Sequence, residues 1–589
     1  MSFTYFVTAA DWGRIAPELV LTAIALLVML VDLFLPRAGK SMRDSGPSNY
    51  LVLPSLSLLG LVGALVATIV LFIAGDQQNA FNQMIGSDQG SLYAYIIILS
   101  ASTLGILLSP GYLRRINIPH QGEYYALMLF ATIGMMLMAA ATSFLTVFLG
   151  LEMLSLALYI LCGFVTRRQT SQEAGMKYFL LSSFASAFLL YGIALAYGAT
   201  GNTSFIGIRN FLAGLAVSQS SPGPLFPSVQ SPTLLLIAMG LLTVGFAFKV
   251  SAIPFQAWTP DVYDGAPAPV TAFMSVGTKA AALIAFARVF DIALFPVRHD
   301  WQPIVLTITI LTIVGGNVLA LVQSNVKRLL AYSSIAHAGY LLIGVVVGGE
   351  VVTVNGKLIA GAVFGLSAIL FYLLSYTFLN LGAFGVVSIL ERADNTGNNL
   401  SEIRGLWYRR PVLAGVLAFF MLSLAGFPPM AGFAAKYYVF YAALVSGHPE
   451  LLIIGVLASV LGMYYYLRVI AVMFMEREQE AAGARSSASG TTSPIPAVGR
   501  RISAKLGAPG TSRGTATAVA VKTPAVSKAK TPVAVEPATA EESSINRDAT
   551  AWTTWAALGI AGAGTLLMGT LLPFWLVDLA QRAAAMMLK

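Results

Sequence analysis

Long apolar stretches follow one another along most of this 589-residue chain, separated by short polar segments. A helix needs about 20 apolar residues to cross the hydrocarbon core of a bilayer, which is about 30 Å thick. Windows of that length predict about fourteen membrane-spanning helices, at residues 15–35, 51–74, 91–109, 123–141, 143–165, 174–199, 232–251, 266–290, 302–322, 328–348, 360–390, 411–446, 450–475 and 552–577. The pattern therefore predicts an all-α membrane protein.

The composition agrees with this fold class and argues against a redox or metal site. The chain is 57% hydrophobic and 10% charged. Its single cysteine, Cys162, excludes a disulfide framework or a thiolate metal cluster within the chain. The sequence contains no dinucleotide-binding fingerprint, no P-loop and no HExxH zinc motif. We therefore expect this chain to bind no metal and no cofactor of its own.

Eight basic residues and no acidic residue lie between residues 481 and 535, and they account for nearly the whole net charge of +9. They belong to one long polar segment, residues 476–551. This segment is rich in Ala, Ser, Thr, Pro and Lys and shows no helical or strand periodicity, so it cannot bury enough apolar area to offset its ordering entropy. Its basic stretch lacks interleaved aromatic residues on which bases could stack. We predict a disordered cytoplasmic loop that is attracted to an anionic membrane surface rather than to nucleic acid.

Basic residues are concentrated in loops that follow odd-numbered predicted helices. They are Arg37, Lys40, Arg43, Arg114, Arg115, Arg167, Arg168, Lys327, Arg328, Arg404, Arg409 and Arg410. The positive-inside bias places these loops in the cytoplasm and both termini on the outer side. The loop after the seventh helix is an exception, because it holds Asp261 and Asp264 and no basic residue.

Four ionisable residues lie inside predicted helices and far from the helix ends: Glu152, Lys249, Lys279 and Lys436. Each would cost on the order of 2.5–3.5 kcal/mol at the middle of the membrane, so each needs a partner, water or a function. Ion pairs that hold helices together are the structural alternative, but one carboxylate cannot neutralise three ammonium groups. Desolvated lysines near other cations exchange protons more readily. We therefore interpret the set as a proton relay, with a partial pairing role for Glu152.

Three further residues are weaker candidates. Lys177 follows Glu173 by four residues, so a local helix pair competes with a relay role. His337 lies inside an apolar span and suits a carrier between lysines, because imidazole titrates near neutral pH. A satisfied interhelical hydrogen bond is the alternative for this histidine. Lys327 lies near a helix end, where we expect it to reach the membrane surface.

Prolines interrupt the seventh and the twelfth predicted helices. Pro254 and Pro260 follow Lys249, and the pair at residues 428–429 precedes Lys436. Proline removes a backbone donor, and in a bilayer the freed backbone must line a polar or water-filled cavity. The two breaks are five helices apart, and an odd number of helices inverts the next unit, which is typical of transporters with inverted repeats.

This spacing predicts the organisation of the chain. We predict an N-terminal three-helix segment (1–122), a first five-helix repeat (123–290) and a second five-helix repeat (302–475). The disordered loop (476–551) and a C-terminal transmembrane helix (552–589) follow.

Five segments are similar to those of a known family. They are GLEMLSLALY at 150–159, EAGMKYF at 173–179, the run from Phe248 through WTPDVYDGAPAPVTAF at 258–273, NVKRLLAYSSIAHAGY at 325–340 and GFPPMAGF at 426–433. With them the chain resembles the subunit N family of bacterial respiratory complex I, the NADH:quinone oxidoreductase. The corresponding membrane protein of photosynthetic NDH-1 complexes belongs to the same family. The resemblance covers about residues 15–475.

The resemblance implies an antiporter-like fold of fourteen helices in the bacterial cytoplasmic membrane, with other membrane-arm subunits as partners. It also implies a proton channel through Glu152, Lys249, Lys279 and Lys436, coupled to quinone reduction elsewhere in the complex. On this view NADH, FMN, iron–sulfur clusters and quinone are bound by other subunits.

Two alternatives remain open at this point. An Mrp-type cation/proton antiporter subunit shares the fold, although the motif DVYDGAP at 261–267 is more similar to that of the complex I family. A non-conducting structural subunit is the second alternative. It predicts that the four buried charges can be neutralised without loss of function.

Overall fold

The computed structural model describes residues 7–35, 49–75, 78–118, 121–218, 232–348, 350–354, 357–475, 551–570 and 573–588. Thirteen helices in these ranges are long and apolar enough to cross a membrane. They are α2 (Ala16–Phe34), α3 (Asn49–Ala74), α4 (Gln89–Arg115), α5 (Gly122–Ala139), α6 (Phe144–Cys162), α7 (Gln169–Thr200), α9 (Pro232–Val250), α11 (Ala268–Arg288), α12 (Arg298–Leu321), α13 (Val326–Gly348), α14 (Gly361–Leu390), α19 (Pro449–Phe474) and α22 (Ala551–Thr570).

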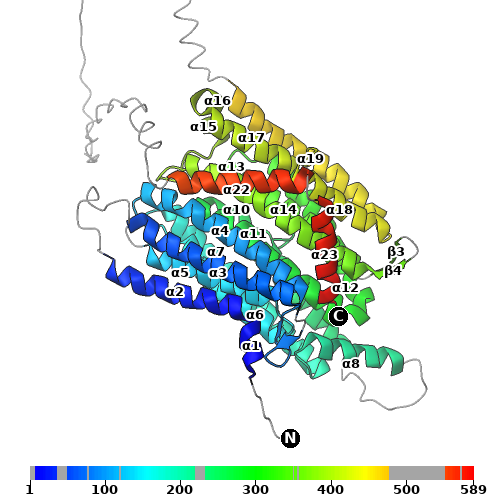
Figure 1. Cartoon of the computed structure of the whole chain (residues 1–589). Helices are drawn as coiled ribbons and strands as arrows, with labels where there is room; N and C mark the ends of the chain where they lie inside the picture. Colours follow the sequence, from blue (N-terminus) through cyan, green and yellow to red (C-terminus); the bar gives the residue numbers. More distant parts are fainter. Residues whose placement is uncertain are drawn as a thin grey trace, which may run out of the picture. The chain divides into compact units, whose positions relative to one another are not determined.

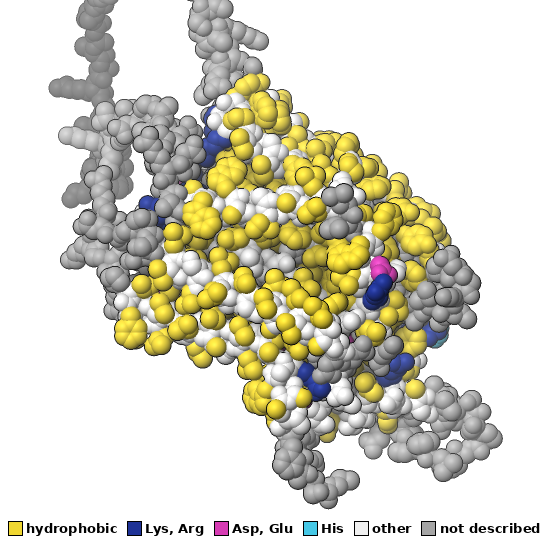
Figure 2. Space-filling model, viewed as in Figure 1, with side chains coloured by type: hydrophobic (Ala, Val, Ile, Leu, Met, Phe, Trp, Pro, Cys, Tyr) yellow, Lys and Arg dark blue, Asp and Glu magenta, His cyan; other side chains and the backbone are white. Residues whose placement is uncertain are grey.

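Two shorter apolar helices, α17 (Pro411–Ala425) and α18 (Ala431–Val445), together occupy the remaining predicted span. All fourteen predicted spans therefore correspond to helices, and the all-α membrane fold is confirmed. The long helices run alongside one another in Figure 1. Hydrophobic side chains cover most of the face seen in Figure 2, as expected for a surface in contact with lipid or with apolar partner helices.

Short elements lie at the two ends of the bundle. Helices α1 (Ala9–Arg14) and α8 (Phe205–Ser218) lie at one end, called here the α8 end (Figure 1). Helices α15 (Leu400–Ile403) and α16 (Leu406–Arg409) lie at the opposite end, called the α15 end (Figure 1). A π-helical turn η1 (Val289–Ala293) and a 3-10 turn η2 (Phe295–Val297) join α11 to α12.

Two small antiparallel hairpins complete the described elements. Strand β1 (Asn79–Ala80) pairs with β2 (Ile85–Gly86), with Asn79 opposite Gly86. Strand β3 (Val351–Val354) pairs with β4 (Lys357–Ala360), with Val351 opposite Ala360. The first hairpin packs against the bundle, because Ala80 is buried and Ile85 contacts the core.

Local sequence signals set several helix starts. Asp88 caps α4 by accepting a hydrogen bond from Ser91 N at 2.9 Å, and Ser143 caps α6 by accepting from Leu145 N at 3.4 Å. Proline begins α17, where its missing N–H has no intrahelical partner to lose. These caps explain why α6 begins at residue 144, close to the predicted start.

Both predicted breaks are present, and their freed backbone groups are satisfied differently. Between α9 and α10 (Trp258–Gly265), Trp258 Nε1 donates to Phe248 O at 3.1 Å, and Ile253 N donates to Thr312 Oγ1 at 2.9 Å. Side chains therefore fill the first break. Between α17 and α18, the chain turns at Gly426, whose φ of +91° lies in the left-handed region that favours glycine.

The last predicted span is wrong at its C-terminal end. Helix α22 ends at Thr570 rather than at residue 577, and a separate helix, α23 (Pro573–Met587), follows it. The physical reason is Pro573, which cannot continue an α-helix but readily begins one. The predicted loop 476–551 lies almost entirely outside the described residues. The inverted repeats and the domain boundaries remain predictions.

Candidate functional site

Lys249 is hydrogen-bonded to a serine on α6, the helix that also carries Glu152. Glu152 and Ser155 are three residues apart and share a face of this helix. Ser155 Oγ accepts a hydrogen bond from Lys249 Nζ at 2.7 Å, and the hydroxyl of Tyr178 on α7 accepts another at 3.2 Å. Glu152 interacts with Lys249 electrostatically but forms no ion pair with it, and its Oε1 is buried without a hydrogen-bond partner among the described residues.

A narrow crevice between α6, α7 and α9 reaches Lys249. The serines at 182 and 186 on α7 line it together with apolar side chains. The buried Ser186 Oγ has no hydrogen-bond partner in the described part of the chain. Lys249 is thus surrounded by hydroxyl groups rather than by carboxylates.

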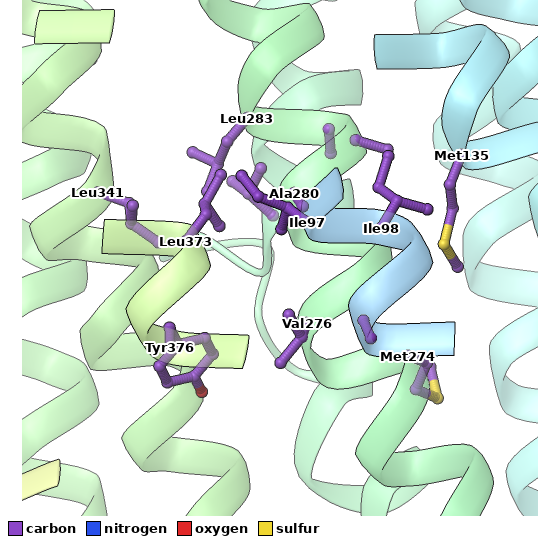
Figure 3. Close-up of a cluster of buried hydrophobic side chains, with 14 of the residues drawn as sticks. Ile97, Ile98, Met135, Met274, Val276, Ala280, Leu283, Leu341, Leu373 and Tyr376 are labelled. Atoms are coloured by element: carbon purple, nitrogen blue, oxygen red, sulfur yellow. The ribbon is translucent and has the colours of Figure 1, made fainter. Parts of the chain in front are cut away.

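Lys279 lies on α11, every residue of which is buried. Its ammonium group donates to the carbonyl of Ser334 on α13 at 2.6 Å and also to the hydroxyl of Ser334. Elsewhere on α11, Val276, Ala280 and Leu283 lie in a buried cluster that also contains Leu341, Leu373 and Tyr376 (Figure 3). Ser334 is therefore the principal polar contact of Lys279.

His337 lies three residues beyond Ser334 on the same face of α13. The hydroxyl of Tyr372 on α14 lies 2.7 Å from Nδ1, and the hydroxyl of Tyr466 on α19 lies 3.1 Å from Nε2. Tyr466 is also hydrogen-bonded to Ser333. The satisfied interhelical hydrogen bonds predicted as one role of this histidine are present, and its role as a proton carrier remains a prediction.

Lys436 occupies the second helix break. All three N–H donors of its ammonium group have acceptors at 3.0 Å: the carbonyls of Leu424 and Ala425 and the hydroxyl of Ser459. The ring of Tyr340 lies 5.5 Å from Nζ. The two carbonyls end α17, where the helix carries partial negative charge. The break therefore supplies the acceptors that hold this lysine.

The three lysines are buried without an ion pair to a described residue, unlike most other buried charges in the bundle. Lys249, Lys279 and Lys436 are 2%, 1% and 5% exposed. Their hydrogen-bond acceptors are neutral hydroxyls and carbonyls, and none of them forms an ion pair with a described residue. Glu152 forms no direct ion pair with a lysine among the described residues, but it interacts electrostatically with Lys249, and its partial pairing role remains a prediction.

Lys177 lies apart from Lys249, Lys279 and Lys436, at the α15 end. It forms ion pairs with Glu173 at 2.7 Å and with Asp261 of α10 at 2.9 Å. Arg328 Nη1 donates to the second oxygen of Asp261 at 2.8 Å. Burial disfavours the ionised form of Asp261, but the hydrogen bonds from Lys177 and Arg328 outweigh burial and hold its pKa below the usual value. The local pair predicted for Lys177 is present.

The same cluster explains the acidic loop that departs from the positive-inside pattern. Asp261 faces two basic residues from neighbouring helices. Asp264 accepts a hydrogen bond from Asn325 at 3.0 Å, and burial raises the pKa of its carboxyl. The loop needs no basic residue of its own, because α7 and α13 supply them.

Lys327 is fully buried, so the expectation that it reaches the membrane surface is wrong. Its Nζ lies 3.2 Å from Glu391, whose other oxygen lies 2.5 Å from Arg168 Nη1. Tyr112 OH donates to the same carboxylate at 2.7 Å. One carboxylate thus holds two cations from distant parts of the chain, and Glu391 was not singled out from the sequence.

Six polar partners of the lysines and of His337 were not among the residues predicted from the sequence: Ser155, Tyr178, Ser334, Tyr372, Tyr466 and Ser459. Helical spacing gives a partial signal for some of them. Ser155 follows Glu152 by three residues, and Ser459 and Tyr466 are seven residues apart on one face of α19. Which lysine each serine meets depends on packing between helices, which spacing within one helix does not encode.

The family model for "NADH:quinone oxidoreductase/Mrp antiporter, TM" matches residues 141–462. NADH-quinone oxidoreductase subunit N of Trichlorobacter lovleyi is 42% identical over 466 residues, which cover 79% of this chain and 88% of the relative. The range matched by the family model includes Lys249, Lys279 and Lys436.

Solved structures show the same fold. A chain of respiratory complex I from Thermus thermophilus with bound aureothin is 29% identical, with a TM-score of 0.65 and coverage of 95% of this chain and 98% of that chain. A chain of the Mrp complex from Dietzia sp. DQ12-45-1b has a TM-score of 0.67 at 18% identity, with coverage of 97% and 98%. At that identity the second similarity shows the fold alone.

Proposed function

The chain belongs to the subunit N family of NADH-quinone oxidoreductases, and from that premise we propose that it translocates protons across the membrane as one subunit of such a complex. Quinone reduction in other subunits drives the transfer. The chain itself contributes a path of protonatable side chains and no redox centre. Other subunits of the complex bind NADH, FMN, iron–sulfur clusters and quinone, and the electrons pass between these groups.

The observation that carries this proposal is the row of buried lysines held only by neutral acceptors. A buried ammonium group without a counter-ion costs several kcal/mol, and a structural role does not require that cost. Neutral acceptors such as hydroxyls and carbonyls can hold the head group of a lysine both as a charged ammonium and as a neutral amine. Losing and regaining a proton is therefore compatible with the packing around each of the three.

The proposed path starts at Glu152 and Lys249, which interact electrostatically, and Lys249 donates a hydrogen bond to Ser155, one helical turn from Glu152. A change of charge near Glu152, caused by quinone chemistry, alters the preference of Lys249 for its proton. The proton then passes from Lys249 to Lys279, from Lys279 to His337, and from His337 to Lys436 at the second break. Lys177 is left out of this path, because two carboxylates hold its head group.

The proposal includes a place in the cell and a set of partners. The chain lies in the bacterial cytoplasmic membrane with both termini on the outer side and residues 476–551 in the cytoplasm. Other membrane-arm subunits surround it as a hetero-oligomer. The Mrp-type alternative shares the family model and the fold, but the matching chain of the Mrp complex is only 18% identical, whereas the subunit N relative is 42% identical.

Lys249→Ala and Lys436→Ala in the intact complex test the proposal. The complex is reconstituted into liposomes, and protons moved per NADH oxidised are counted. We expect both variants to move fewer protons per NADH than the wild type. Lys177→Ala is the matched control and stays near the wild-type ratio, because partly exposed ion pairs contribute about 0–1 kcal/mol. An unchanged ratio in an assembled Lys249→Ala or Lys436→Ala complex would contradict the proposal.

A further inference from the structure

Two adjacent tyrosines on α19 are both buried, yet their hydroxyl groups meet different partners. Tyr466 OH is hydrogen-bonded to Ser333 and lies 3.1 Å from His337 Nε2. Tyr465 OH donates to the side-chain oxygen of Asn317 at 3.3 Å. The two rings contact each other, with centroids 4.4 Å apart, and Tyr465 also interacts with Ser333. The two tyrosines therefore differ in one respect: the hydroxyl of Tyr466 reaches His337, and that of Tyr465 reaches Asn317.

Tyr466 stands between two members of the proposed path. Its partner Ser333 is the chain neighbour of Ser334, whose hydroxyl and carbonyl hold Lys279. Its other partner is the imidazole of His337. Ser333 and Tyr466 therefore form one polar connection toward His337 within the described residues. Tyr376 is a second polar neighbour, because it interacts with Ser334 and its ring centroid lies 4.9 Å from that of His337.

The chemistry of these groups suits transfer of a proton. A hydroxyl donates one proton while it accepts another, and a neutral imidazole accepts on one nitrogen while it donates from the other. Both ring nitrogens of His337 have a hydroxyl within hydrogen-bond distance, from Tyr466 and Tyr372. The amide of Asn317 differs, because its donor N–H and its acceptor oxygen are separate atoms. The bond from Tyr465 to Asn317 therefore positions the ring of Tyr465 and does not lead a proton to His337.

Resting on the proposed function, we propose that Tyr466 is a proton-relay residue that connects the serine pair at Lys279 to His337. In the step, Tyr466 OH gives its proton to His337 Nε2 and takes one from Ser333. The serine pair is reprotonated from the ammonium group of Lys279, which becomes a neutral amine. One proton leaves Lys279, one arrives on His337, and each hydroxyl between them returns to its starting state. No electron is transferred.

Tyr466→Phe in the intact complex tests this role, because it removes the hydroxyl and keeps the ring. Tyr465→Phe is the matched control, with the same chemical change at the neighbouring buried position. We expect Tyr466→Phe to slow proton pumping on the order of tenfold or more, and Tyr465→Phe to pump near the wild-type rate. Equal loss in both variants would assign Tyr466 a packing role and overturn the proposal.

A second readout separates transfer from structure. Fluorotyrosine incorporated at position 466 keeps the shape of the side chain and makes its hydroxyl more acidic. We expect the pH profile of pumping to shift to lower pH with fluorotyrosine at 466 and to stay unchanged with fluorotyrosine at 465. Normal pumping in Tyr466→Phe together with loss of pumping in Lys279→Ala would overturn the role of Tyr466 and leave the proposed function standing. Normal pumping in Lys279→Ala would overturn both.

Discussion

At the scale of single residues, the interior contains two kinds of buried charge. Lys249, Lys279 and Lys436 rest on neutral acceptors, whereas Glu391 is surrounded by the cations Arg168 and Lys327. Hydropathy could locate the first kind, because a charge inside an apolar run is visible in the sequence. It could not locate the second kind, because these partners come from loops and helix ends 64 and 223 residues apart.

We predict that Glu391→Gln destabilises the chain by about 3–5 kcal/mol, because it leaves two buried cations without a counter-charge. Thermal unfolding of the purified complex measures the change. Asp578→Asn is the control, since Asp578 forms an exposed ion pair with Arg582 and its loss costs about 1 kcal/mol or less. A similarly small change in both variants would show that Glu391 does not hold the network together.

At the scale of helices, the two breaks and the close crossings set the geometry of the site. The positions of the prolines in the sequence were enough to predict both breaks. Packing decides what fills them: Trp258 and Thr312 at the first, and Lys436 at the second. Helix α8 and the turn η1 had no counterpart among the predicted elements, because short segments that cover a bundle end lack a long apolar run.

Helices α5 and α6 touch through glycine, just before Glu152. A side-chain carbon added at Gly150 would lie 2.6 Å from Met138 N, so the two helices would have to separate. We predict that Gly150→Ala destabilises the chain by about 1–3 kcal/mol through overpacking, as measured by thermal unfolding. Gly240→Ala on α9, where nothing lies within 4 Å of the added carbon, is expected to be neutral or stabilising by up to about 1 kcal/mol. Equal unfolding temperatures for both variants would contradict this account of the crossing.

At the scale of the whole chain, several buried ion pairs lie at the bundle ends, and three lysines that form no ion pair with a described residue lie in its middle. Arg288 pairs with Asp88 at 2.7 Å at the α8 end, and Asp261 and Glu391 each join two cations at the α15 end. The ends therefore have the ion pairs that stabilise a structure. In the middle, Lys249, Lys279 and Lys436 are held by neutral hydroxyls and carbonyls, an arrangement compatible with the proposed proton transfer.

The central claim is that the lysine row works by releasing and regaining protons and not by presenting fixed positive charge. Lys279→Arg tests this directly, because arginine keeps the charge and does not give up its proton in proteins. The measurement is the number of protons moved per electron pair by the reconstituted complex. The account predicts that assembled Lys279→Arg moves as few protons as Lys279→Ala. Wild-type proton counts in Lys279→Arg would contradict it.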